Sequence, residues 1–137
     1  MSAILPGGKL SPRVDNGIIY FVEGDTFELT FELDISDADG VPIILDGGTF
    51  HFTIKSPREG VVKVWDIDEF TQPEEGGLEN AVFFAIQFDD ATVSKLYKGK
   101  YTYTISYDYT LVYDPEDDTE NRSGRSTILY RNSLIVE

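Results

Sequence analysis

The sequence predicts an all-β fold, an antiparallel β-sandwich of about seven strands with one short helical turn before the sixth strand. Apolar and polar residues alternate with a period of two along most of the chain, which is typical of strands with one face buried. Clusters of Gly, Pro, Asp and Ser separate the apolar runs at short intervals. No strand–helix–strand repeat occurs, and 137 residues suffice for one hydrophobic core, so a single antiparallel sandwich is favoured.

Seven segments carry the strand pattern. The clearest runs from residue 27 to 35, where Phe27 and Leu29 point to one side and Glu28 and Thr30 to the other. The fifth segment is apolar on both faces, which favours a central position. In the last segment the alternation breaks at Arg131, which predicts a bulge. The predicted strands are 17–22, 27–35, 49–55, 61–67, 81–88, 100–113 and 125–137, and their expected common core is Phe27, Phe31, Leu33, Phe50, Phe52, Ile54, Phe84, Ile86 and Ile105.

The segment 89–98 does not alternate with the period of two that the strands have. Asp89 or Asp90 can cap the start of a helix. This helix of one or two turns is expected to end near Leu96, before Gly99. This segment is the predicted helical turn.

Composition argues against several classes of function. The chain has 11 basic and 25 acidic residues, a net charge of 11 − 25 = −14, which disfavours binding to nucleic acids or to anionic membranes. It has no cysteine, which removes thiol catalysis, disulfides and Cys-ligated zinc. The one histidine, His51, alternates with Phe50 and Phe52 and is expected to face solvent. We therefore expect no catalytic residues, no cofactor and no metal.

Three features allow a second interpretation. The acidic stretch 114–120 and the turn 37–40 contain possible calcium ligands, but neither matches an EF-hand, so solvated turns are favoured. The tyrosines at positions 101, 103, 107 and 109 are candidates for a sugar-stacking platform. Because they share a face with Ile105, core packing is the favoured interpretation.

Residues 1–16 form a predicted extended arm, and residues 17–137 form the sandwich. The arm has no amphipathic period, and Pro6 with two following glycines stands where a signal peptide would need an apolar core, so no export signal is expected. An extended arm cannot bury its apolar side chains on itself. We expect it to contact another chain through Ile4, Leu5, Leu10 and Val14.

The run from Leu96 to Tyr103 resembles the tyrosine corner of the immunoglobulin fold, in which Leu-x-x-Gly-x-Tyr leads from a helical turn into the sixth strand. Leu96, Gly99 and Tyr101 occupy the matching positions, and Tyr103 stands where that fold has its second cysteine. The resemblance implies an immunoglobulin-like sandwich, with the Tyr101 hydroxyl bonded to backbone between residues 94 and 98.

The segments EGDTFELTF (23–31), DGVPIIL (39–45) and FHFTIKSP (50–57) resemble the N-terminal immunoglobulin-like domains of bacteriophage tail and baseplate proteins, such as baseplate upper proteins. The resemblance implies a non-enzymatic structural protein of a virion, in the tail, baseplate, head fibre or capsid decoration, made in the cytoplasm of the host bacterium. Its partners would be other virion proteins and copies of itself. The alternative is a carbohydrate-binding or adhesive module that uses the tyrosines or the loops 68–80 and 114–124.

Overall fold

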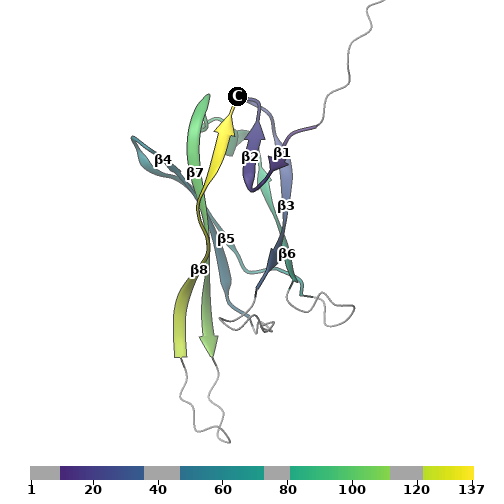
Figure 1. The fold of residues 1–137 in the computed structure, drawn as a ribbon, viewed down its shortest axis with the longest axis vertical. Coiled ribbons are helices and arrows are strands. Elements are labelled where there is room, and N and C mark those ends of the chain that lie inside the picture. The colour runs from purple at the N-terminus through teal and green to yellow at the C-terminus, as the bar shows by residue number, and fades with distance from the viewer. Residues whose placement is uncertain (1–9, 36–46, 73–80, 112–121) are drawn as a thin grey trace, which may run out of the picture.

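The structure, a computed structural model, describes residues 10–35, 47–72, 81–111 and 122–137. Within them the protein is an all-β sandwich with one sheet of six strands and one of two, so the predicted fold class is confirmed. In Figure 1 β7 and β8 form the long hairpin on the left, and β3 and β6 lie together on the right.

The larger sheet has the strand order β1-β2-β8-β7-β4-β5. All its neighbours pair antiparallel except β2 and β8, which are parallel. This parallel pair departs from the antiparallel arrangement expected from the sequence. The strands are β1 (Arg13–Asp15), β2 (Ile18–Phe21), β4 (Thr49–Ser56), β5 (Gly60–Ile67), β7 (Gly99–Leu111) and β8 (Arg122–Val136).

The smaller sheet consists of β3 (Phe27–Asp34) and β6 (Ala81–Phe88), paired over eight residues without a break in register. The two faces of β3 follow the predicted alternation: Phe27, Leu29 and Leu33 are buried, and Glu28, Thr30, Glu32 and Asp34 are exposed. Because a slip of one residue would invert every face, the register expected from the sequence is confirmed.

The two sheets enclose a single core in which aromatic rings predominate. The Phe52 ring lies 5.2 Å from Phe31, 5.3 Å from Trp65 and 5.2 Å from Tyr103 between centroids, so it joins both sheets. Of the nine residues expected to share one core, eight are buried and Phe31 is partly buried against them.

The short helix α1 (Asp90–Val93) precedes β7, the sixth of the predicted strands. Asp89 is its N-cap, and its carboxylate accepts a hydrogen bond from the Thr92 amide at 2.9 Å. The bulge expected near Arg131 is present: Arg131 has a positive φ of 54°, and the pairing of β7 with β8 shifts between Tyr103 and Ile105.

Candidate functional site

Exposed apolar side chains gather at the N-terminal edge of the larger sheet. Leu10 is 92% exposed, Val14 55% and Val22 54%. Leu10 and Val14 belong to the predicted assembly arm, whereas Ile4 and Leu5 lie outside the described residues. Large exposed apolar side chains in one region are typical of surfaces that contact another molecule.

The predicted end of the arm at residue 16 is wrong, because Arg13–Asp15 form the edge strand β1 and pair with β2. The turn between them is Asn16-Gly17, with φ values of 52° and 80°. Asn and Gly tolerate positive φ, and Asn-Gly is the strongest short hairpin signal that a sequence contains. This dipeptide would have revealed β1 in the sequence.

Side chains hold this hairpin to the end of the sheet. The Arg13 guanidinium lies 4.4 Å from the centre of the Tyr20 ring and 3.5 Å from the Glu137 carboxylate. The Ser11 hydroxyl donates to the Asp25 carboxylate at 2.6 Å. A cavity of about 230 Å³ opens beside these contacts, lined by Leu10, Ser11, Arg13, Tyr20, Phe21, Val22 and Glu137. The site is therefore an open edge strand with an apolar border.

The predicted tyrosine corner is present. Tyr101 is 8% exposed, and its hydroxyl donates to the Tyr97 carbonyl at 3.0 Å and accepts from the Tyr97 amide at 2.9 Å. Leu96 is buried beneath the turn, and Gly99 begins β7. The corner joins α1 to the strand and plays a structural part.

Replacing Tyr101 with phenylalanine should destabilise the protein by about 1 kcal/mol or somewhat more, because both polar backbone groups of Tyr97 lose their partner. Urea unfolding followed by circular dichroism measures the change. The control Tyr130→Phe alters a ring that is 66% exposed and should stay within about 0.5 kcal/mol of the parent. Equal stabilities for the two variants would contradict a structural role for the corner.

The other inward tyrosines of β7 also bind loops. The Tyr103 hydroxyl donates to the Gly17 carbonyl in the β1–β2 turn, and the Tyr107 hydroxyl donates to the Gly47 carbonyl before β4. Both rings are buried, and Tyr109 packs partly buried against the core. The favoured interpretation of these tyrosines as core residues is confirmed for Tyr101, Tyr103 and Tyr107, which are buried.

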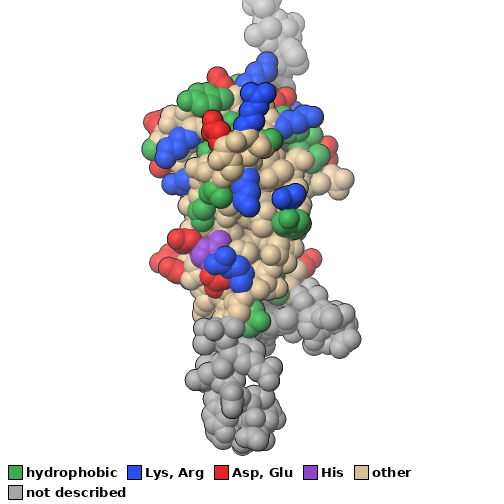
Figure 2. Space-filling model, turned by 90° about the vertical axis from the view of Figure 1, so that its left-hand side faces the viewer, with side chains coloured by type: hydrophobic (Ala, Val, Ile, Leu, Met, Phe, Trp, Pro, Cys, Tyr) green, Lys and Arg blue, Asp and Glu red, His purple; other side chains and the backbone are tan. Residues whose placement is uncertain are grey.

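The outer face of the larger sheet carries a ladder of charged side chains that sequence reasoning missed. Asp66 on β5 lies 2.6 Å from His51 Nδ1, and Asp108 on β7 lies 2.6 Å from His51 Nε2. Arg125 on β8 then donates to Asp108 from Nε at 2.6 Å and from Nη2 at 3.0 Å. Figure 2 looks onto this side and shows the one histidine between acidic and basic groups. The ladder crosses four strands.

The geometry favours a doubly protonated His51. A neutral imidazole has one N–H and can donate to one carboxylate, whereas here both ring nitrogens face carboxylate oxygens. Burial alone would lower the pKa of His51, but the hydrogen bonds to Asp108 and Asp66 outweigh it, and this pKa is raised above its ordinary value. The hydrogen bonds from Arg125 and then His51 hold the pKa of Asp108 well below its ordinary value.

The ladder should make stability depend on pH. Since the pKa of folded His51 is raised, its contribution is complete below the ordinary value of 6.5 and is lost as the pH rises through the raised value. Asp108 has a lowered pKa, so its contribution is present above 3.8 and is lost in acid. We expect the urea midpoint of the parent to fall more from pH 5.5 to pH 8.5 than that of His51→Gln. Parallel pH profiles for the two proteins would contradict the ladder.

The ladder is not arranged as a metal centre. Asp66 and Asp108 meet opposite nitrogens of the ring and so do not converge on one point. Within the described residues, no group of three or more His, Asp or Glu side chains could hold a metal ion. The acidic stretch 114–120 and the turn 37–40, considered above as calcium ligands, lie outside the described residues.

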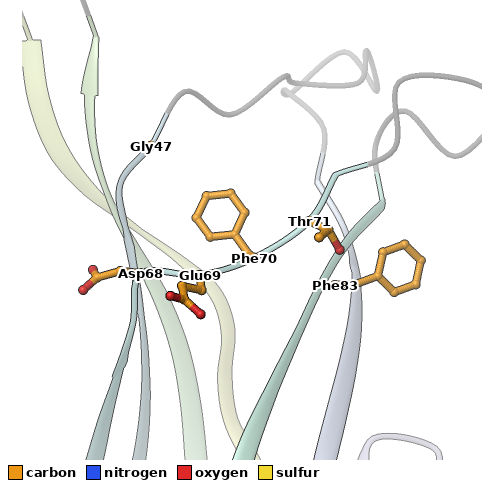
Figure 3. A pocket seen from close by; sticks show the side chains of 6 residues that line it. All are labelled: Gly47, Asp68, Glu69, Phe70, Thr71 and Phe83. Carbon is orange, nitrogen blue, oxygen red and sulfur yellow. The ribbon is translucent and has the colours of Figure 1, made fainter.

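A second cavity, of about 500 Å³, lies at the end of β5 (Figure 3). Asp68, Glu69, Phe70 and Thr71 line it in succession, with Gly47 near Asp68 at one end and Phe83 beside Thr71 at the other. The Phe70 ring packs edge-on against Phe50 at 5.1 Å, so the segment is attached to the core. These residues belong to the loop 68–80 that the carbohydrate-binding alternative invokes, of which residues 68–72 are described.

Among the described residues, no helix is long and apolar enough to cross a membrane. No protein-family model, curated protein or solved structure matches this chain.

Proposed function

We propose that this protein is a non-enzymatic structural component of a bacteriophage virion, in the tail, baseplate, head fibre or capsid decoration. It acts through contacts with other virion proteins and with copies of itself. The proposal rests on the sequence resemblance to phage tail and baseplate domains together with the surface at the N-terminal edge.

The observation that carries the proposal is the exposure of Leu10, Val14 and Val22 around the edge strand β1. An edge strand offers unpaired backbone groups to another chain, and monomeric proteins usually protect such edges. Here β1 is bordered by apolar side chains, and the chain continues upstream through Ile4 and Leu5. An assembly protein requires such a surface.

The use of the reactive side chains also supports a structural role. Both nitrogens of His51 are bound to carboxylates, and the hydroxyls of Tyr101 and Tyr103 are bound to backbone groups of loops. Each of these groups contributes to holding strands or loops in place.

Deleting residues 2–9 tests the proposal. The deletion ends before Ser11 and β1, whose contacts hold the hairpin. The melting temperature of the isolated chain should change by no more than about 2 °C. A phage that carries the truncated allele should incorporate less of the protein into its particles, as measured by mass spectrometry of purified virions.

The matched control replaces residues 2–9 with a Gly/Ser segment of the same length, which should show the same defect because the apolar side chains are missing. A large loss of melting temperature in both variants would show that the arm belongs to the core of its own domain. Absence of the full-length protein from purified particles would refute the virion proposal itself.

A carbohydrate-binding module remains the second candidate, favoured by the cavity at Asp68–Thr71, where two carboxylates border aromatic rings. Neighbouring acidic and aromatic side chains can hydrogen-bond and stack on a sugar. Selective binding on a glycan array that is lost in Glu69→Ala would favour this candidate over the assembly role.

A further inference from the structure

The smaller sheet has an open edge along β3. β3 pairs with β6 on one side, and no described strand pairs with its other side. Two-stranded sheets are marginal units, and a third strand would extend the cover over the larger sheet. Phe31, in the middle of β3, points inward but is only partly buried. Within the described residues, no strand covers the larger sheet beside this edge of β3.

The other edges are less suited to accept a strand. The second side of β6 is already bridged by Thr71, which exchanges two backbone hydrogen bonds with Phe83. β1 has three residues. β5 is longer, but its pairing with β4 shifts between Ile54 and Lys55, and such bulges protect an edge. Among the described edges, that of β3 offers eight residues in unbroken register and has no partner strand in the described part of the chain.

The N-terminal arm matches this edge in length and charge. Nine residues precede the described part of the chain, which span roughly 30 Å when extended, and the eight residues of β3 span about 26 Å. The exposed face of β3 carries Glu28, Glu32 and Asp34 and no base. The arm carries Lys9 and no acid. The two segments are therefore complementary.

We propose that β3 accepts residues 1–9 of a second copy of this chain as an additional strand. The inference rests on the proposed assembly role of the arm and names its acceptor. A second copy is favoured because Leu10, the residue that follows the arm, is 92% exposed and so does not pack on its own domain. Each copy then donates one strand and accepts one, which links copies head to tail.

Cysteine cross-linking tests the proposal, because the chain has no cysteine of its own. Full-length Leu5→Cys is mixed with full-length Glu32→Cys, or with Glu28→Cys, and treated with a short bis-maleimide. Both acceptor positions are exposed on β3, so the substitutions should not disturb folding. We expect a cross-linked dimer of one copy of each variant, detected by mass spectrometry.

The matched control acceptor is Glu59→Cys, an exposed acid in the turn between β4 and β5. It should give severalfold less dimer than Glu32→Cys. A further acceptor carries Thr30→Cys on β3. Adding Glu28→Lys and Glu32→Lys to this acceptor reverses the charge of the edge and should reduce the yield of its cross-linked dimer with Leu5→Cys. Equal yields at residues 32 and 59 would overturn the proposal.

The double variant Leu5→Cys with Glu32→Cys separates the two possible sources of the strand. Cross-linking only within one chain would overturn the proposal by showing that the arm completes its own sandwich. If cross-links to β3 fail while the deletion of residues 2–9 still impairs incorporation into particles, the arm binds elsewhere. In that case β3 would not be the acceptor, and the proposed assembly role of the arm would stand.

Discussion

Replacing Phe52 with alanine should destabilise the protein by about 3–5 kcal/mol, the largest effect expected of any single core change. Phe52 is fully buried, and its ring contacts Phe31 from the smaller sheet and Trp65 and Tyr103 from the larger one. The variant loses the transfer free energy of the ring and leaves a cavity between the sheets. Since domains of this size have about 5–15 kcal/mol of stability, the loss would be a large fraction of the total.

Chemical unfolding followed by tryptophan fluorescence measures this loss, because Trp65 lies against the replaced ring. The control Val64→Ala removes methyl groups from a neighbouring strand at a side chain that is 43% exposed, and it should cost about 0.5 kcal/mol or less. A cost below about 1.5 kcal/mol for Phe52→Ala would mean that the two sheets do not pack across this ring. Phe31→Ala should cost less than Phe52→Ala, because Phe31 is only partly buried.

Replacing Gly48 with alanine should cost about 2–4 kcal/mol, through backbone strain and a steric clash together. Gly48 has a φ of +96°, where a side chain is disfavoured. A Cβ atom here would also lie 2.5 Å from the carbonyl oxygen of Asp108, a backbone atom of β7 that cannot turn away. Because β7 pairs with β4 at this point, relief of the clash would disturb the pairing of Thr49 with Asp108.

The matched control is Gly24→Ala. Gly24 has a similar φ of +92°, but a Cβ atom there would meet nothing within 4 Å. It should cost about 1 kcal/mol, the strain alone. The difference in unfolding free energy between the two variants isolates the close approach of Gly48 to β7. Equal losses would show that β4 and β7 separate at this end without cost.

The side-chain alternation along each strand could be predicted because it depends on neighbours in the sequence. A period of two gave the buried face of β3, and the run Leu96–Tyr103 gave the tyrosine corner with its hydroxyl bound to Tyr97. The N-cap at Asp89 is equally local. Each of these features lies within a few residues of the signal that predicts it, so no knowledge of strand order is required.

The hairpin of β1 and β2 could not be predicted from the hydrophobic periodicity of the sequence. β1 has three residues and is exposed throughout, so it has no alternation to detect. Its pairing with β2 depends on the turn at Asn16-Gly17 and on tertiary contacts, such as Arg13 with Tyr20 and Glu137. For this reason the arm was predicted to extend to residue 16.

The sequence alone determined the fold class, the faces of the strands and the tyrosine corner of this protein. Only the tertiary structure decided which strands are neighbours. The ladder, the parallel pairing of β2 with β8 and the open edge of β3 all follow from that strand order. His51 and Asp108 are 57 residues apart in the chain. Nothing in the local pattern of either residue indicates the other, because the pairing of β4 with β7 brings them together. Cross-strand contacts depend on strand order and register, which form only when distant apolar faces are buried together.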